Sequence, residues 1–368
     1  MKKIALLFIL LVSTISVVAQ DKIEQELKNL TDTNQHQKII DLHSKKHANY
    51  NAKSLFYIGQ AYYINEDDNN CIKFMDLSIQ KGPKDPGPHY IKASTLNYMK
   101  KYDEAIKSFR EAISLNPNDP NFYNGIGDSY YNLKKHDLAL ESYKKATELE
   151  NCPDRPYAMI VQIYSDQNNT KKALEASYVT KSKVTKGSNS YINALFNIGL
   201  LESLTENYDN AEQAFLELIK IDTSDFHSFA KLIQIYYHKR EYDKAKPYKD
   251  HLYQASKRGL LKDNLEDMFC FDQFKWNGKL IQAFERYEEG NKPNIYNKHL
   301  FYVVNENNKI EYRIQTEYSP IAVELGEFKY MLCATKDGTH INSGLGFNDN
   351  FNYDDLKKAV IYMLEKNK

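Results

Sequence analysis

The sequence is poor in the residues that mark several common protein classes. Its 368 residues include 4 cysteines, 10 prolines, 14 glycines and 1 tryptophan, and 49 basic against 49 acidic side chains leave no formal net charge. Low glycine and proline contents exclude collagen-like and low-complexity chains. A balanced charge also lacks the long-range positive field of a nucleic-acid binder, so we expect no nucleic-acid partner.

Motifs of enzyme and metal chemistry are missing as well. The sequence has no Walker-type loop, no G-x-S-x-G and no H-E-x-x-H run, and Gly344-Leu345-Gly346 is an isolated glycine pair. It has no CxxC and no run of clustered histidines and cysteines, so the sequence does not support a structural zinc site. We therefore expect no enzyme, no cofactor and no metal.

The N-terminus has the pattern of a signal peptide. Lys2 and Lys3 form a positive region, residues 4–18 are mostly apolar, and residues 17–19 before Gln20 suit a signal-peptidase site. No cysteine near this site could carry a lipid, and no second apolar run is long enough to span a bilayer. We predict a secreted or periplasmic protein, and the Ala-Gln junction resembles those of Bacteroidetes.

A period of 34 residues organises the chain after this leader. Small residues lie 34 apart at Cys71, Ala105, Ala139 and Ala173. In the same frame, starting at Ala52, the eighth position is mostly small and the twenty-fourth is mostly bulky: Gly59, Ala93, Gly127 and Val161 against Met75, Phe109, Tyr143 and Ser177. A fixed period of this size is typical of a solenoid of stacked helical hairpins.

The frame resembles the tetratricopeptide repeat. The copy at 86–119 carries Ala105, Phe109, Ala112 and Pro117, and the next carries Tyr123, Ile126, Gly127, Tyr130, Ala139, Tyr143 and Ala146. Six copies run from residue 52 to about 259, with Lys92, Glu202 and Lys249 as departures from the pattern. The resemblance implies a mainly α fold, an α-solenoid of about six helical hairpins, that serves as a protein-binding scaffold.

Two other regions flank the repeats. Residues 20–51 contain two helical stretches that we expect to cap the solenoid. From about residue 260 the period is lost, and strands are predicted at 280–287, 299–304, 309–316, 329–335 and 339–341, the last two joined by Asp337-Gly338. A final helix with Asn352 as N-cap completes a predicted α+β domain of residues 260–368 with antiparallel hairpins.

The α+β domain contains candidate polar residues but no pattern that unites them. They are His299, His340, Glu285, Glu288, Glu289, Glu317, Glu324 and Asp337, and each is explained by a strand end or a turn. Cys270 and Cys333 lie in apolar stretches, so the sequence leaves open whether they form a disulfide or stay buried thiols. An enzyme with its site here is the least favoured function.

Binding residues follow from the resemblance alone. Ligands of this family are usually held on the inner, concave face by positions 2, 5, 9, 12 and 13 of each first helix. Transferred to this sequence, the candidate partner-binding residues are Phe56, Gln60, Tyr63, Tyr90, Asn97, Tyr98, Asn124, Asp128, Tyr131, Asn132, Gln162, Gln234 and Tyr237. Tyrosines and amides suit an unstructured peptide or protein segment.

Three functions therefore remain open at this stage. The favoured one is an exported adaptor that binds a peptide or protein partner. A glycan or cell-wall ligand would suit the same aromatic and amide side chains. The carboxylate clamp of chaperone-binding relatives requires basic residues at positions 5 and 9, where this chain has Phe56 and Gln60 in its first unit, so capture of an acidic chain end is disfavoured.

Overall fold

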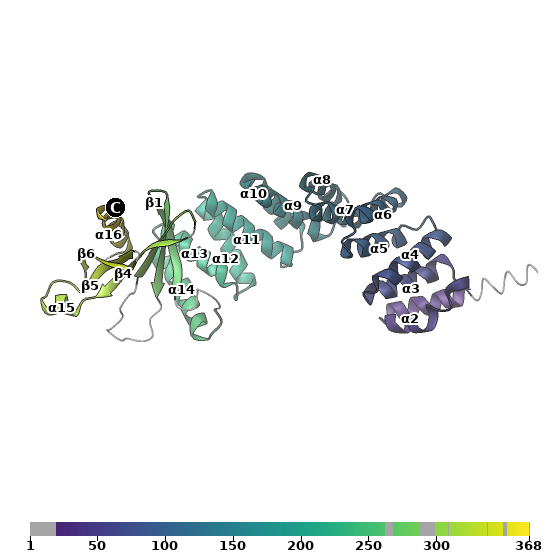
Figure 1. The fold of residues 1–368 in the computed structure, drawn as a ribbon, viewed down its shortest axis with the longest axis horizontal. Helices are drawn as coiled ribbons and strands as arrows, with labels where there is room; N and C mark the ends of the chain where they lie inside the picture. The colour runs from purple at the N-terminus through teal and green to yellow at the C-terminus, as the bar shows by residue number, and fades with distance from the viewer. Residues whose placement is uncertain are drawn as a thin grey trace, which may run out of the picture. The chain divides into compact units, whose positions relative to one another are not determined.

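The computed structural model describes residues 20–261, 268–286, 299–307, 309–336, 338–348 and 352–367. The predicted signal peptide, residues 1–19, lies outside these ranges. The chain divides into two compact units, Met1–Ala194 and Leu195–Lys368. The second unit contains the last helical hairpins together with the sheet that follows them in sequence (Figure 1).

In its described residues, the first unit is built from helical hairpins preceded by three further helical segments. Residues 20–32 are helical, α2 spans His36–His43 and the short 3-10 helix η1 spans His47–Asn49. The hairpins pair α3 (Ala52–Ile64) with α4 (Asp68–Lys81), α5 (Pro86–Tyr98) with α6 (Tyr102–Leu115), α7 (Pro120–Asn132) with α8 (His136–Thr147), and α9 (Asp154–Asp166) with α10 (Thr170–Lys183). Leu27, Leu30 and Ile39 share a core with α3 and α4, so the first two segments cover the end of the first hairpin.

The hairpin turns share one backbone feature that the sequence does not reveal. Between paired helices, a residue other than glycine adopts a φ of 55° to 63°: Glu66, Lys100, Lys134, Asn168, Glu206 and Arg240. This left-handed conformation is uncommon for such residues, and its recurrence shows that the repeat imposes it. Acidic residues such as Asp103 and Asp137 lie in the first turn of the second helices, where they meet the positive end of the helix dipole.

Close packing inside each hairpin explains the alternation of small and bulky positions. A Cβ added to Gly127 would lie 2.6 Å from the ring of Tyr143, and one added to Gly199 would lie 2.6 Å from the ring of Phe215. The glycine therefore makes room for the aromatic ring of the paired helix, as close helix packing requires. The predicted six hairpins are confirmed, with α11 (Asn189–Leu204) crossing the boundary between the two units.

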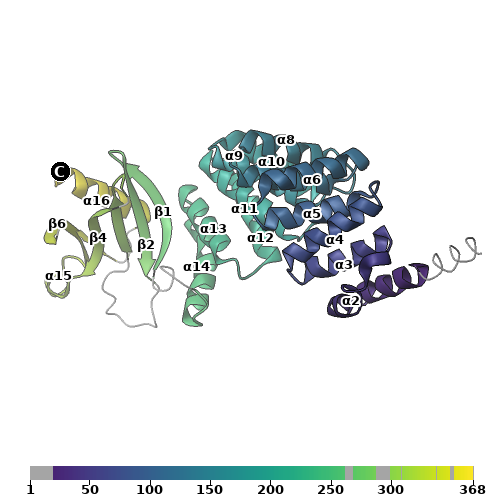
Figure 2. The same ribbon diagram turned by 45° about the vertical axis from the view of Figure 1, so that its right-hand side comes forward.

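The second unit joins helices to an antiparallel sheet. Its helices after α11 are α12 (Tyr208–Ile221), α13 (Phe226–His238) and α14 (Tyr242–Lys257). Over the described residues the sheet has six strands in sequential order: β1 (Met268–Trp276), β2 (Lys279–Arg286), β3 (His299–Val304), β4 (Ile310–Tyr318), β5 (Tyr330–Lys336) and β6 (Thr339–Phe347). A short helix, α15 (Pro320–Glu324), lies between β4 and β5, and α16 (Tyr353–Lys366) follows the sheet. Helix α13 lies beside β1 (Figure 2).

One face of the sheet is buried by α16. Leu356, Val360, Met363 and Leu364 form an apolar stripe on this helix and share a core with Phe301, Val303, Ile314, Leu332 and Ala334. The prediction of Asn352 as the N-cap is confirmed, because its side chain accepts a hydrogen bond from the backbone N–H of Asp355 at 2.9 Å. The expected hairpins β3–β4 and β5–β6 are also present, although Asp337 in the second turn lies outside the described residues.

Two of the departures from the repeat pattern have specific partners. Glu202 is buried, and its carboxylate accepts hydrogen bonds from Asn207 Nδ2 at 2.9 Å and Asn210 Nδ2 at 3.1 Å. Lys249 Nζ donates to the hydroxyl of Tyr237 at 3.2 Å. A buried polar group that finds partners in this way does not prevent the hairpin from packing.

The four cysteines are free thiols, so Cys270 and Cys333 do not form the disulfide that the sequence left open. They lie on β1 and β5, which are not neighbours in the sheet. Within the described ranges, none of the helices has both the length and the apolar character that crossing a bilayer requires.

Candidate interaction site

Eleven of the thirteen predicted binding residues lie on the first helices of the hairpins in the first unit. Helices α3, α5, α7 and α9 are neighbours in space, because α5 contacts both α3 and α7, and α7 contacts α9. The residues are Phe56, Gln60 and Tyr63 on α3, Tyr90, Asn97 and Tyr98 on α5, Asn124, Asp128, Tyr131 and Asn132 on α7, and Gln162 on α9. We call this set the first-helix face.

Asn97 links α5 to α7. Its Nδ2 donates to the backbone oxygen of Gly125 at 3.2 Å, and its Oδ1 accepts from Ser129 Oγ at 2.7 Å. Both ends of the amide are therefore engaged across the helix boundary, which fixes the orientation of the side chain. Such a bridge holds the two helices in one register on this face.

Asp128 joins three helices. Its carboxylate accepts from Arg155 Nε of α9, 3.0 Å from both oxygens, and from the hydroxyl of Tyr143 of α8 at 2.6 Å. Burial, followed by the neighbouring charge and hydrogen bond of Asp128, raises the pKa of Tyr143 above its ordinary value, so this hydroxyl stays a donor. The positive charge of Arg155 is balanced locally by Asp128.

A second carboxylate ties α7 to α9. Asp166 accepts from the hydroxyl of Tyr131 at 3.0 Å and from Gln162 Nε2 at 2.7 Å. Partial burial, with a further contribution from Asp166, raises the pKa of Tyr131. Two of the predicted binding residues thus converge on an acid at position 13 of its unit, one of the positions that the resemblance assigns to ligand binding.

The tyrosines of this face differ in exposure. Tyr98 is 67% exposed and Tyr63 is 39% exposed, whereas Tyr90 is half-buried with its ring centroid 5.4 Å from that of Phe122 and 6.0 Å from that of Phe109. Tyr63 and Tyr98 are therefore the rings that a ligand can cover. Tyr90 contributes mainly to the packing between hairpins.

Three amides and one further ring complete the face. Asn132 Nδ2 donates to the backbone oxygen of Asp128 at 2.8 Å, and Phe56 has Lys53 Nζ 4.8 Å from its ring centroid. Gln60 Oε1 and Asn124 Oδ1 are buried and have no hydrogen-bond partner among the described residues. A buried acceptor without a donor costs about 1–3 kcal/mol, which rotation of the amide toward a ligand would recover.

Two predicted residues, Gln234 and Tyr237, do not lie on an open face. Gln234 Nε2 donates to the backbone oxygen of Cys270 on β1 at 3.1 Å. The Tyr237 ring centroid lies 4.5 Å from that of Phe271 and 5.2 Å from that of Tyr353. The family positions assigned both residues to the groove, but in this protein β1 and α16 cover them, so they are packing residues of the second unit.

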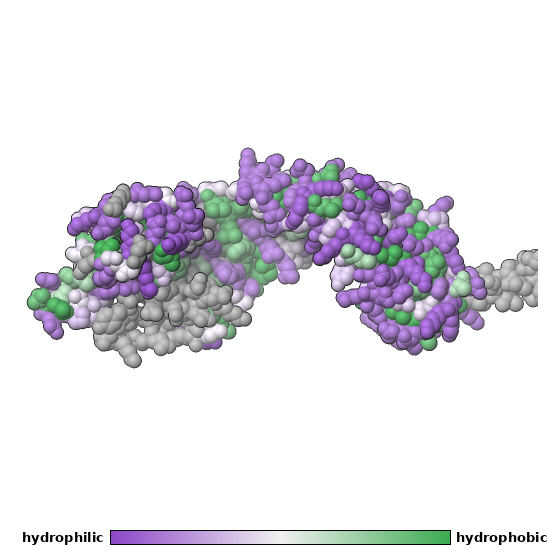
Figure 3. All heavy atoms as spheres, viewed as in Figure 1, coloured by the Kyte–Doolittle hydropathy of each residue, from purple (hydrophilic) through white to green (hydrophobic). Residues whose placement is uncertain are grey.

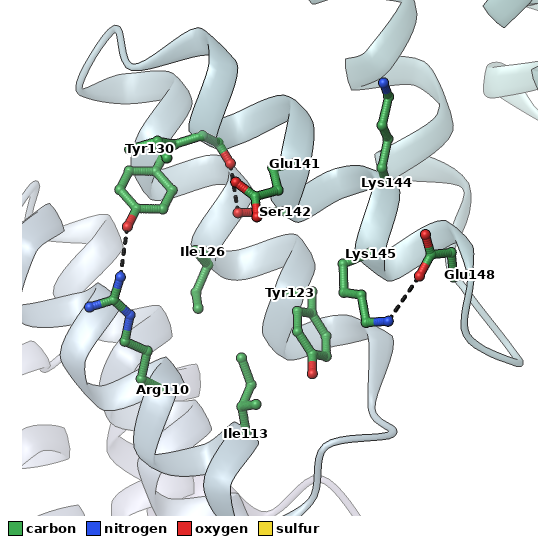
Figure 4. Close-up of a pocket in the computed structure, with 11 residues that line it drawn as sticks. Arg110, Ile113, Tyr123, Ile126, Tyr130, Glu141, Ser142, Lys144, Lys145 and Glu148 are labelled. Atoms are coloured by element: carbon green, nitrogen blue, oxygen red, sulfur yellow. Dashed lines mark hydrogen bonds and ion pairs between the residues drawn. The ribbon is translucent and has the colours of Figure 1, made fainter.

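A groove opens on the other side of α7. It has a volume of about 590 Å³ and is lined by Arg110 and Ile113 of α6, by Tyr123, Ile126 and Tyr130 of α7, and by Leu138, Glu141, Ser142, Lys144, Lys145 and Glu148 of α8 and its C-terminal end (Figure 4). Arg110 donates to the Tyr130 hydroxyl at 2.9 Å, and Lys145 pairs with Glu148 at 2.9 Å. At about 100° per residue, these α7 side chains point away from Asn124 and Asp128. The groove is therefore separate from the first-helix face.

The visible surface of the first unit is mostly hydrophilic, with separate hydrophobic residues among the polar ones (Figure 3).

The candidate residues of the C-terminal region are distributed over several elements. Glu324 is exposed on α15 and His299 is half-buried at the start of β3, while Glu288, Glu289 and Asp337 lie outside the described residues. Glu285 pairs with His299 along the β2–β3 ladder. Glu317 and His340, which the sequence could not connect, lie close together with Cys333.

Family models match the repeat region. Residues 94–134 match a model described as TPR repeat, residues 120–151 and 192–225 match a tetratricopeptide repeat model, and residues 32–112 match the model of anaphase-promoting complex, cyclosome, subunit 3. None of these matches extends beyond residue 225. The chain therefore contains tetratricopeptide repeats followed by a region without a family match. Arrays of this class act in general as scaffolds for protein–protein interaction.

Solved structures with tetratricopeptide arrays resemble this chain at low identity. The structure of YrrB, described as a TPR protein with an unusual peptide-binding site, is 18% identical over 48% of this chain and 89% of its own, with a TM-score of 0.41. PilF of Pseudomonas aeruginosa is 13% identical over 56% of this chain and 91% of its own, with a TM-score of 0.44. The Cut9–Hcn1 hetero-tetramer of the APC/C is 15% identical over 67% of this chain and 45% of its own, with a TM-score of 0.41. No curated protein matches the sequence.

Proposed function

We propose that this chain is an exported interaction scaffold whose first-helix face binds an extended segment of a protein partner. The observation that carries the proposal is the arrangement of α3, α5, α7 and α9. Exposed Tyr63 and Tyr98 lie on these helices together with amides and carboxylates that are fixed by hydrogen bonds within and between helices. Rigid aromatic rings supply contact area at low entropic cost, and amides can pair with an extended backbone.

The charge of the face favours a segment without an acidic end. Arg155 is engaged by Asp128, and the positions that would form a carboxylate clamp carry Phe56 and Gln60 on α3. Asp128 and Asp166 add negative charge to α7 and α9. A neutral or weakly basic segment is therefore the expected partner, because like charges at an interface oppose binding.

Exposed tyrosines give the direct test of this surface. We expect the double substitution Tyr63→Ala and Tyr98→Ala to reduce recovery of the partner from native cell envelopes about tenfold or more, since buried interface tyrosines often contribute 1–2 kcal/mol or more each. Affinity purification of the mature protein followed by quantitative mass spectrometry measures the effect. Tyr178→Ala is the matched control, because Tyr178 is also an exposed tyrosine but lies on a second helix, α10.

Equal recovery with the wild type and the double variant, or an equal loss with the control, would contradict binding through the first-helix face. A binding assay on protein-free peptidoglycan tests the alternative ligand. If the protein binds to this peptidoglycan and the binding depends on Tyr63 and Tyr98, the ligand of the first-helix face is a saccharide and the proposal of a protein partner is wrong.

Export has its own test. We expect the protein isolated from its native cells to begin at Gln20, since residues 17–19 suit a signal-peptidase site. Mass spectrometry of the N-terminal peptide measures this directly, with total lysate and envelope fractions compared. Recovery of a chain that retains Met1 in the cytoplasmic fraction would rule out export by this route.

A further inference from the structure

Three adjacent strands of the second unit bring together three side chains that commonly bind metals. Glu317 lies on β4, Cys333 on β5 and His340 on β6, and one potential ligand atom of each lies within 4.8 Å of the others. Cys333 is buried, Glu317 is half-buried and His340 is exposed. The cluster is thus reachable from solvent on one side and fixed by the sheet on the other.

The register of the sheet explains the convergence. Gln315 pairs with Cys333 across β4 and β5, and Thr335 pairs with His340 across β5 and β6. Because side chains alternate along a strand, Glu317, Cys333 and His340 point to the same face. Ile314 and Leu332 point to the opposite face, where they share the core with α16. The cluster therefore lies on the face that α16 does not cover.

The donor set selects a class of ion. A thiolate, an imidazole and a carboxylate suit Zn²⁺, whereas Ca²⁺ and Mg²⁺ prefer oxygen ligands alone. Ligand distances of about 2.0–2.3 Å from zinc place neighbouring ligand atoms about 3.3–3.8 Å apart in a tetrahedron. The three atoms need to approach by at most about 1.5 Å from the separation of 4.8 Å at most, within reach of rotations about the side-chain bonds of His340 and Glu317.

A neighbouring amide behaves as an outer-shell group would. Gln315 Nε2 donates to Glu317 Oε1 at 2.6 Å and so orients the carboxylate. Gln315 Oε1 is buried and has no hydrogen-bond partner among the described residues. A water molecule on a metal ion with three protein ligands would supply a donor of the kind that this oxygen lacks.

The backbone at the cluster is irregular in a way that is common at binding sites. The β5–β6 ladder shifts register between Met331 and Cys333, and Gly344 on the bulged strand has a φ of +70°. A bulge bends its strand and changes where the adjacent side chains point. Here the bulge lies within the β5–β6 strand pair that carries Cys333 and His340.

We propose that Glu317, Cys333 and His340 bind one divalent transition-metal ion, with Zn²⁺ preferred, through one ligand atom each and with a fourth position open to water. This site is independent of the first-helix face, which lies in the other compact unit.

Metal titration of the full-length mature protein tests the site. The protein is first stripped of metal with a chelator, reloaded with Zn²⁺ and dialysed to remove the excess. We then expect one equivalent of Zn²⁺ per chain by elemental analysis. With Co²⁺ as the probe, we expect the near-ultraviolet absorption that a cobalt–thiolate bond produces. Cys333→Ser and His340→Ala should each weaken Zn²⁺ binding at least tenfold, and Cys333→Ser should remove the thiolate band.

Two controls separate the site from adventitious binding. Cys152→Ser changes a half-exposed thiol in the first unit, and His227→Ala changes an exposed histidine at the start of α13, so both should bind Zn²⁺ as the wild type does. Circular dichroism of each variant checks the fold. Failure of the folded wild type to retain Zn²⁺, or unchanged binding in both Cys333→Ser and His340→Ala, would overturn the proposal.

Discussion

Replacing Phe109 by alanine is expected to lower the free energy of unfolding of its hairpin by about 3–5 kcal/mol. The Phe109 side chain is 1% exposed and belongs to a core with Ala93, Leu96 and Ile126. Its removal leaves a cavity between α6 and its neighbours, and each repeat can compensate only through adjacent repeats. Thermal and urea unfolding by circular dichroism, with hydrogen exchange of α6 and α7, measures the loss.

Gly125→Ala extends this experiment, because here the change from glycine to alanine inside a helix should lower the stability instead of raising it. A Cβ added at Gly125 would lie 2.2 Å from Cζ of Phe109, so Gly125→Ala alone should be destabilising by about 1–3 kcal/mol despite the better helix propensity of alanine. In the Phe109→Ala background the same change has space, and it should then stabilise by up to about 1 kcal/mol. An effect of the same sign in both backgrounds would show that the two residues are not in direct competition for space.

Asp272→Ala is expected to destabilise the second unit by about 2–4 kcal/mol. The Asp272 carboxylate is buried in β1, accepts from the Tyr353 hydroxyl at 2.7 Å and from Lys357 Nζ at 2.9 Å, and has His238 Nε2 at 3.9 Å. It therefore connects β1 to α16 and faces α13. Burial, with a further contribution from Asp272, raises the pKa of Tyr353, so this hydroxyl would remain a donor without an acceptor after the substitution.

A comparison with an exposed ion pair shows whether burial of Asp272 is the cause of the expected loss of stability. Asp209 also forms an ion pair with a lysine, Lys239, at 2.7 Å, but its side chain is 85% exposed. Asp209→Ala should change the stability of the second unit far less than Asp272→Ala does, because water solvates the separated charges. Similar melting temperatures for the two variants would contradict the role assigned to Asp272.

The repeat array was predictable from the sequence because most units carry the same pair of a small and a bulky residue at positions that pack against each other. Gly127 and Tyr143 are 16 residues apart in the chain and in contact in the structure, and the same pair of positions recurs as Gly199 and Phe215. A steric requirement that recurs at a fixed interval is visible even when single copies are degenerate. The hairpins β3–β4 and β5–β6 were predictable for a similar reason, since alternation and turn residues are local signals.

Other elements gave no such signal. The register of β1 shifts between Cys270 and Asp272, and Phe271 and Asp272 are both buried, so the expected alternation is broken at that point. Helix α15 has five residues, too few to show a helical period, and only Ser319 before Pro320 marks its start.

Local sequence patterns were also insufficient to predict the surroundings of some candidate binding residues. Positions in a repeat predicted that Gln234 and Tyr237 face outward from α13, but they could not predict that β1 covers that face. Glu317, Cys333 and His340 are 16 and 7 residues apart, so only the strand register brings them together. Contacts made between elements distant in sequence leave no local pattern to detect.

The cover that β1 provides for α13 determines how the array ends. Ile233, Tyr236 and Leu252 of the final hairpin share one core with Phe271 and Ile281 of the sheet. A chain cut after Gly259 would leave this hairpin surface in water, where a second molecule could associate with it. The sheet therefore covers the surface of the final hairpin through which the helical array of one molecule could otherwise associate with that of another.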